Sequence, residues 1–263
     1  MYTPVPKASA RIEQSIKRFR PIVDTLSARD VNEADTVTLV RDFVEAAFGY
    51  DKYTEITSEY VISAGSRVDL SIKVDGKLRV HIECKAVNIA LKPQHIEQAI
   101  TYALKSESDY AFLTNAREWQ VYRITNAHPL QYEMVHSFNL LEDKPETLVD
   151  SIYPLAREGW ERNTLDLIFS HQRVLSKYNL AALLQSPVML DVLQRELKRI
   201  SKEVKVSTDQ IKDMLVNDVL KRDVTEGAQA MEATQLVSSA ASVMLKRRGI
   251  RDSDAAPEMI AEA

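Results

Sequence analysis

The stretch VDLSIKVDGKLRVHIECKA, residues 68–86, decides the fold because it has the pattern of a β-hairpin. Apolar and polar residues alternate on both sides of a central Asp-Gly pair, which is typical of two strands joined by a tight turn. The polar positions include Asp69, Glu83 and Lys85. The sequence therefore predicts a hairpin with one apolar face and one unusually charged face.

The length of the turn determines which side chains lie opposite one another. A two-residue turn at the Asp-Gly pair would set apolar against polar residues along the hairpin, so this register is disfavoured. A three-residue turn over residues 74–76, with Gly76 left-handed in a bulge, matches the apolar faces and places Asp69 opposite His81 and diagonal to Glu83. A loop one residue longer on the other side, which pairs Asp69 directly with Glu83, is the alternative. Both registers bring the two carboxylates together.

The residues around the hairpin predict an α/β fold in which helices flank a mixed sheet. Helical spacing in the first 30 residues ends at Pro21, and a second helix begins after Asn32 and ends at Gly49. A third helix opens at Pro93. Short segments rich in β-branched and aromatic residues predict strands at residues 56–62, 67–74, 78–85, 110–114 and 119–124.

After about residue 145 the strand pattern disappears and helical patterns follow one another. Ser186 before Pro187 is a good helix start, and Ser207 with Gln210 forms a capping-box pattern. The expected organisation is a helical or extended lead-in over residues 1–30, an α/β domain over 31–140 and an all-helical domain over 141–263 with a frayed end. The helical domain would serve oligomerisation, partner binding or DNA binding.

Composition sets loose limits on the class of protein. The chain has 263 residues, a formal net charge of −4 and a single cysteine, Cys84, which excludes an internal disulfide framework. No long apolar run and no apolar N-terminal signal segment are present, so we expect a soluble, cytoplasmic protein without a membrane partner. An acidic balance argues against a non-specific nucleic-acid coat protein, but not against an enzyme that meets DNA on a local patch.

Charges on the predicted strand face suggest chemistry. Two carboxylates and an ammonium at close range are unfavourable unless a metal ion or a substrate uses them. Mg²⁺ prefers oxygen ligands, and Asp69, Glu83 and the backbone carbonyl of Cys84 are candidates, with Mn²⁺ as a substitute. Lys85 would orient an attacking water or offset developing charge. The competing interpretation is a solvent-facing strand with scattered charges.

Asp69 followed by Glu83-Cys84-Lys85 on the next strand resembles the PD-(D/E)XK nuclease superfamily. Gln98 and Tyr102, four residues apart on one helix face, resemble its QxxxY element.

The resemblance extends to both sides of this motif. The segment FLTNAREWQVYRI, residues 112–124, resembles the closing strands of the N-terminal nuclease domain of type I restriction enzyme motor (R) subunits and their stand-alone relatives. Residues 32–51 resemble the opening helix of that domain, whose early glutamate would be Glu33, with Glu45 as the alternative.

The resemblance, which covers roughly residues 30–125, implies a restriction-endonuclease-like fold and Mg²⁺-dependent cleavage of DNA phosphodiesters in restriction or defence. It implies catalytic roles for Asp69, Glu83, Lys85 and Glu33, with Asp69 and Glu83 as metal ligands, and support from Gln98 and Tyr102. The namesake proline is absent from SAGSRV, before Asp69. No GxxxxGK[ST] phosphate loop occurs, so the chain is not a complete translocating subunit.

Partners follow from the same resemblance. DNA is the expected substrate, and a homodimer would let two sites cut two strands. Independently of the resemblance, Lys92, Lys105, Arg117 and Arg123 flank the α/β module and are candidate contacts for backbone phosphates, with an ordinary solvated surface as the alternative. Two alternatives remain open: an inactive nuclease-fold protein that binds nucleic acid, and a regulatory subunit acting with a separate ATPase or defence partner.

Overall fold

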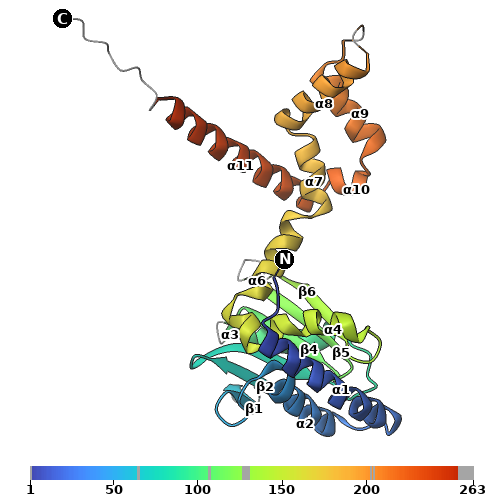
Figure 1. The fold of residues 1–263 in the computed structure, drawn as a ribbon, viewed down its shortest axis with the longest axis vertical. Helices are drawn as coiled ribbons and strands as arrows, with labels where there is room; N and C mark the ends of the chain where they lie inside the picture. Colours follow the sequence, from blue (N-terminus) through green and yellow to red (C-terminus); the bar gives the residue numbers. More distant parts are fainter. Residues whose placement is uncertain are drawn as a thin grey trace, which may run out of the picture. The chain divides into compact units, whose positions relative to one another are not determined.

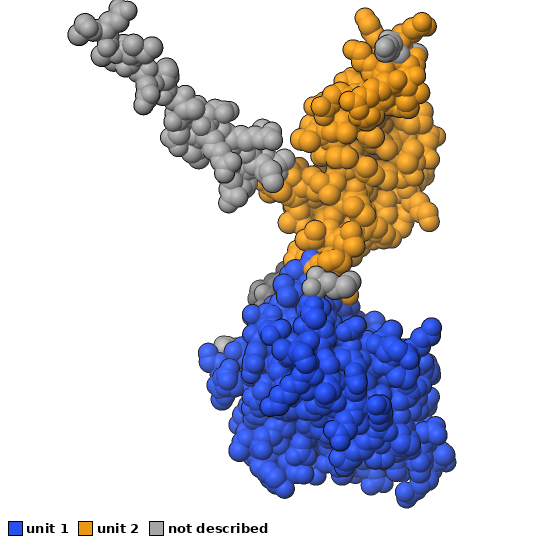
Figure 2. Space-filling view, in the orientation of Figure 1, with its two compact units in different colours: residues 1–170 blue, residues 171–263 orange. Residues whose placement is uncertain are grey.

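The computed structural model describes residues 2–63, 66–105, 108–125, 131–201, 203 and 205–253, with the backbone alone for 59–63, 66 and 241–253. These residues form two compact units, unit 1 over residues 1–170 and unit 2 over residues 171–263 (Figure 2). The predicted frayed end falls on residues 254–263, outside the described residues. The domain boundaries expected near residues 30 and 140 stay a prediction.

Unit 1 is built on a mixed six-stranded sheet with strand order β1-β2-β3-β4-β5-β6 (Figure 1). The strands are β1 (Ile56–Ser63), β2 (Ser66–Val74), β3 (Lys77–Cys84), β4 (Tyr110–Thr114), β5 (Glu118–Thr125) and β6 (Gln131–Asn139). β3 and β4 are parallel, and every other neighbouring pair is antiparallel. The predicted mixed sheet is confirmed. β6 was not predicted, because charged and small polar residues interrupt its apolar alternation and its first four residues are exposed.

Helices cover both faces of this sheet, as the α/β prediction requires. On one face, α1 (Pro6–Ala28), α2 (Glu33–Phe43), the π-helical turn Val44–Phe48 and α4 (Pro145–Ile152) share a core with the strands. Trp119 is fully buried there, stacked on Phe138 at 5.8 Å between ring centroids. On the other face, α3 (Pro93–Lys105) packs its buried Ile96, Ala99, Ile100 and Ala103 against β4 and β5. A short helical segment, Tyr153–Leu155, and α5 (Arg157–Glu161) follow α4.

Both ends of the second predicted helix are confirmed. Asn32 caps α2, since its side chain accepts a hydrogen bond from the Asp35 N–H. Gly49, with φ of 81°, ends the π-helical turn that continues α2.

The expected interruption at Pro21 is wrong, because α1 continues through Pro21 to Ala28. A proline inside a helix removes one backbone hydrogen bond and costs about 3 kcal/mol. Burial of Ile12, Ile16 and Phe19 on the inner face of α1 offsets that cost.

The hairpin turn also differs from the prediction. Asp75 and Gly76 form a two-residue turn with φ of 52° and 73°, the left-handed pair that a type I′ turn needs. Positive φ at Gly76 is therefore confirmed, whereas the three-residue turn is wrong.

A β-bulge restores the register that the short turn would have spoiled. The register shifts between Ile72 and Lys73, and Arg79 is the extra residue on β3. Beyond the bulge Leu70 pairs with Ile82, so the apolar faces match again. The same register continues to Asp69 opposite Glu83, the pairing of the alternative register, although the turn is shorter than that alternative required.

The C-terminal region is helical, as predicted. Its elements are α6 (Thr164–Val174), which ends in unit 2, then α7 (Lys177–Leu184), α8 (Pro187–Ile200), α9 (Thr208–Met214), the π-helical turn Leu215–Val219, α10 (Arg222–Thr225) and α11 (Ala228–Ser253). The capping box of Ser207 and Gln210 is present at the start of α9. In the described part of the chain, none of the helices combines the length and the apolar character that crossing a bilayer requires.

Candidate active site

Glu83 lies near the carboxyl end of β3, on the sheet face that α3 covers. It pairs with Leu113 of β4, which belongs to the core beneath α3. Only 4% of its side chain is exposed. Its Oε1 accepts a hydrogen bond from Lys85 Nζ at 2.6 Å, whereas its buried Oε2 has no hydrogen-bond partner among the described residues. The site thus contains a buried acid with one unsatisfied oxygen.

Burial is the main reason that the pKa of Glu83 is raised to about 7. The hydrogen bond from Lys85 lowers this pKa, while the nearby charges of Asp69 and Glu33 raise it further. The pKa of Glu83 therefore lies near neutral pH because of its burial and of charges on β2, on α2 and on the residue that follows β3.

Asp69, on β2, joins the two strands of the hairpin next to Glu83. Its Oδ2 accepts a hydrogen bond from the Cys84 N–H at 2.7 Å. This bond holds the carboxylate at the end of β3 and explains its influence on the pKa of Glu83. The thiol of Cys84 itself is buried in the opposite core, and burial raises its pKa.

Lys85 lies between two carboxylates. Its Nζ is 2.6 Å from Glu83 Oε1 and 3.7 Å from Glu33 Oε2, with 19% of the Lys85 side chain and 51% of the Glu33 side chain exposed. Burial opposes the ammonium charge, but the hydrogen bond to Glu83 and the two acids raise the pKa of Lys85 overall. Glu45, the alternative to Glu33, instead pairs with Lys52 at 3.1 Å. Of the two helix carboxylates, Glu33 is the one placed beside the cluster.

Gln98 and Tyr102 connect α3 to β2. Gln98 Nε2 donates to the Tyr102 hydroxyl at 3.1 Å and to the backbone carbonyl of Arg67 at 3.4 Å. Tyr102 is buried and Gln98 is exposed. Because Arg67 is two residues from Asp69 on β2, this pair braces α3 beside the strand that carries Asp69.

His95 is a nearby residue that the sequence interpretation missed. Its Nδ1 accepts a hydrogen bond from the Lys92 N–H at 3.2 Å. Burial lowers its pKa, as do the charges of Lys85 and Lys92, whereas Glu33 opposes the shift. Its spacing of three residues from Gln98 is the sequence signal that places it on the same face of α3.

His81 is also on this sheet face, but it is part of the packed interior. It is fully buried and its Nδ1 lies 2.9 Å from the Ser71 hydroxyl. Burial lowers the pKa of His81 to about 4, so the imidazole is neutral at neutral pH.

The four candidate phosphate contacts differ in their surroundings. Arg123 is 2.9 Å from Asp166, and Arg117 is 3.8 Å from Glu142, so both are partly neutralised. Lys92 and Lys105 are exposed.

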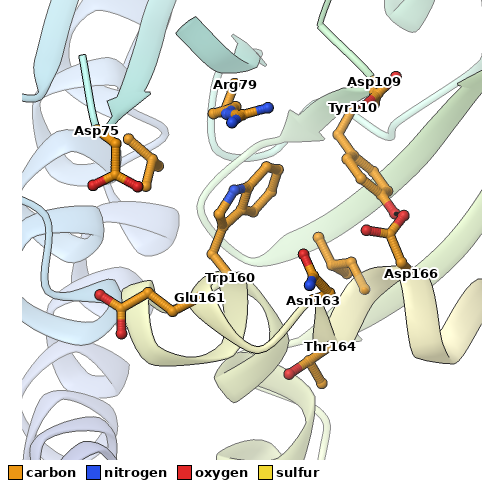
Figure 3. A pocket seen from close by; sticks show the side chains of 11 residues that line it. Asp75, Arg79, Asp109, Tyr110, Trp160, Glu161, Asn163, Thr164 and Asp166 are labelled. Atoms are coloured by element: carbon orange, nitrogen blue, oxygen red, sulfur yellow. Dashed lines mark hydrogen bonds between the residues drawn. The ribbon is translucent and has the colours of Figure 1, made fainter. Parts of the chain in front are cut away.

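A separate cavity of about 220 Å³ lies near the hairpin turn, at the end of β3 opposite to Glu83 (Figure 3). Its wall includes Asp166, whose Oδ1 accepts hydrogen bonds from the Tyr110 hydroxyl at 2.8 Å and from Arg123 at 2.9 Å. These contacts tie α6 to the sheet. The cavity is therefore distinct from the charged cluster of Asp69, Glu83, Lys85 and Glu33.

The cluster has the donor chemistry of a divalent-cation site but not a complete ligand set. Within the described ranges, no group of three or more His, Cys, Asp or Glu side chains is arranged to hold a metal ion. The unsatisfied Oε2 of Glu83 and the neighbouring carboxylate of Asp69 are, however, the hard oxygen donors that Mg²⁺ prefers. A cation bound here would offset the free-energy cost of burying the charge of Glu83.

Comparison with known proteins supports the resemblance inferred from the sequence. Residues 38–138 match the model of a protein family described as Type I restriction enzyme R protein N terminus (HSDR_N). The matched segment starts within α2 and stops one residue before β6 ends, so it includes Asp69, Glu83 and Lys85 but not Glu33. A search of curated proteins and a search of solved structures each found no match.

Proposed function

Because the chain carries a domain like the N terminus of type I restriction enzyme R proteins, we propose that it is a Mg²⁺-dependent endonuclease that hydrolyses DNA phosphodiester bonds. Its role would be restriction or defence against foreign DNA, in the cytoplasm. The observation that carries the proposal is the buried Glu83, with one unsatisfied oxygen, held beside Asp69 and Lys85.

Asp69, Glu83 and the backbone carbonyl of Cys84 would hold the cation, with Glu33 as an auxiliary ligand. Mg²⁺, or Mn²⁺ in its place, would polarise the phosphodiester and lower the pKa of a bound water. The rigid hairpin supplies the preorganisation of the two carboxylates, because the Cys84 N–H fixes the position of Asp69.

Lys85 would act on the reacting water or on developing charge at the phosphate. Glu83 and Glu33 flank its ammonium and raise its pKa, so Lys85 keeps its charge at neutral pH. A fixed positive charge next to the carboxylates offsets the negative charge that builds up during phosphodiester hydrolysis. Gln98 and Tyr102 would support this arrangement by holding α3 against β2.

The helical unit 2 would supply partner contacts. It exposes large apolar side chains, including Val174, Val188, Ile200 and Val219, which suit a protein interface. Homodimerisation would bring two active sites to one DNA duplex.

A catalytically inactive, regulatory subunit acting with a separate partner is the second candidate function. It is favoured by the incomplete ligand set, since the described residues lack a group of three metal-ligating side chains. An ATPase partner would then supply DNA translocation.

A cleavage assay distinguishes these two functions. Purified full-length protein is incubated with supercoiled and linear DNA in Mg²⁺, in Mn²⁺ and in chelator. We expect cleavage only with a metal ion, and loss of cleavage in Asp69→Asn. Glu97→Gln, which alters an exposed acid on α3, is the matched control. A wild-type protein that cuts no DNA until a partner is added would favour the regulatory subunit.

A further inference from the structure

The topology of the sheet brings the start of α3 to the candidate active site. β3 and β4 are parallel, so the chain must return along the sheet through α3 before β4 begins. Residues 85–92 make the connection from the end of β3 to Pro93, the first residue of α3. The first turn of α3, which contains His95, therefore lies at the same edge of the sheet as Glu83 and Lys85.

The hydrogen bond to the His95 ring defines which ring nitrogen is the donor in the neutral form. Nδ1 accepts from the Lys92 N–H at 3.2 Å, so in the neutral ring the proton resides on Nε2. Nε2 makes no hydrogen bond with any residue that the structure describes. A ring nitrogen that accepts a hydrogen bond carries no proton, so this contact requires the neutral ring, and burial and the charges of Lys85 and Lys92 lower the pKa of His95 in the same direction.

The helical position of His95 directs it to the same side as the QxxxY pair. His95, Gln98 and Tyr102 are spaced by three and four residues, which places them on one stripe of α3. The Gln98 amide is committed to the Tyr102 hydroxyl and the Arg67 carbonyl, and these contacts orient the stripe toward β2. His95 stands one turn nearer to the start of the helix, in the first turn of α3.

We propose that His95 is a substrate-contacting residue whose Nε2–H donates a hydrogen bond to a phosphate oxygen of the bound DNA strand. The inference rests on the proposed nuclease function and adds a residue outside the Asp-Glu-Lys motif and the QxxxY pair. A neutral donor suits this position, because it binds an anionic oxygen without adding a second cation beside Lys85. The Lys92 backbone N–H fixes the ring so that the donor is preorganised.

Three variants of the full-length chain test the role of the Nε2–H. His95→Leu removes the donor, His95→Gln restores a side-chain N–H, and His171→Leu changes an exposed histidine on α6 as the matched control. Binding of a fluorescent DNA duplex is measured by anisotropy in Ca²⁺, and cleavage is measured in Mg²⁺. Loss of one hydrogen bond to a charged acceptor should weaken binding or reduce kcat/KM about tenfold or more in His95→Leu. His95→Gln should recover most of the loss, and His171→Leu should match the wild type.

The outcomes separate this inference from the proposed function. If His95→Leu has the same DNA affinity and the same kcat/KM as the wild type, the proposed role of His95 is overturned. Equal losses in His95→Leu and His95→Gln, with unchanged thermal unfolding, would overturn it as well. If the wild type binds DNA but does not cut it with any of the metal ions tested, the nuclease proposal fails. The binding data then still decide the role of His95. A wild type that neither binds nor cuts DNA would overturn both.

Discussion

Replacing Glu83 by glutamine should increase the stability of the metal-free protein at high pH while abolishing cleavage. Glutamine keeps an oxygen that can accept the hydrogen bond from Lys85, but it removes the charge that is buried beneath α3. The proposed metal-binding role requires Glu83 to be ionised, whereas its burial makes ionisation unfavourable. The variant therefore separates the stability of the fold from the chemistry of the site.

The expected magnitude follows from the pKa of Glu83, which rises from its ordinary 4.5 to about 7. Such a shift disfavours the ionised folded state by about 3 kcal/mol. Between these two values the folded protein binds a proton that the unfolded chain has already released, so wild-type stability falls as pH rises through this range. The advantage of Glu83→Gln should accordingly grow by about 2 to 3 kcal/mol between about pH 5 and about pH 8.

Urea unfolding of both proteins in the presence of chelator, followed by circular dichroism at several pH values, measures this difference. Glu97→Gln is the control, because its carboxylate is exposed. A stability difference between Glu83→Gln and wild type that stays constant with pH would refute the assignment of a raised pKa to Glu83. Added Mg²⁺ should stabilise the wild type at high pH but not Glu83→Gln, if Glu83 is a metal ligand.

Three further perturbations address the site and the core. Lys85→Met should abolish DNA cleavage while leaving the far-ultraviolet circular dichroism spectrum unchanged. Loss of a positioned charge should reduce the cleavage rate at least about tenfold. Residual cleavage above about one-tenth of the wild-type rate would therefore contradict the role of Lys85. Burial lowers the pKa of His81 from 6.5 to about 4, so between these pH values the unfolded chain binds a proton at this residue and the folded protein does not. Wild-type stability should lose about 2 kcal/mol through this residue between about pH 7 and about pH 5. His81→Gln should lack that loss, and identical pH slopes in urea unfolding would count against it. Trp119→Ala should lower the unfolding free energy by about 3 to 5 kcal/mol, because it empties the centre of the aromatic core, and a change below about 1 kcal/mol would show that this core repacks.

The features that sequence predicted well are those set by neighbouring residues. Alternation over residues 68–86 predicts the hairpin, and the Asn32 cap and the capping box of Ser207 and Gln210 are formed as expected. Glu83 and Lys85 are two positions apart, so they are expected on one face. Asp69 joins them in both registers considered for the hairpin, so the charged cluster was predicted even though the favoured register did not form.

Some predictions failed because distant contacts decided the outcome. Pro21 does not end α1, since packing of the inner helix face against the core outweighs one lost hydrogen bond. β6 was missed because pairing with β5, rather than its own alternation, makes it a strand. The two-residue turn is tolerated only because the bulge at Arg79 shifts the register of β3 back by one residue.

The sequence by itself determined the α/β class, the hairpin with its acids and its lysine, and the helical C-terminal region, because each depends on periodicity and capping within a few residues. Only the tertiary structure decided that Glu33 rather than Glu45 stands beside Lys85, that Glu83 is buried with an unsatisfied oxygen, and that α3 starts at the sheet edge where β3 ends, which brings His95 to that edge. These properties arise where α2, α3 and β3 meet. Burial and electrostatic coupling are sums over groups far apart in the chain, and no local pattern encodes them.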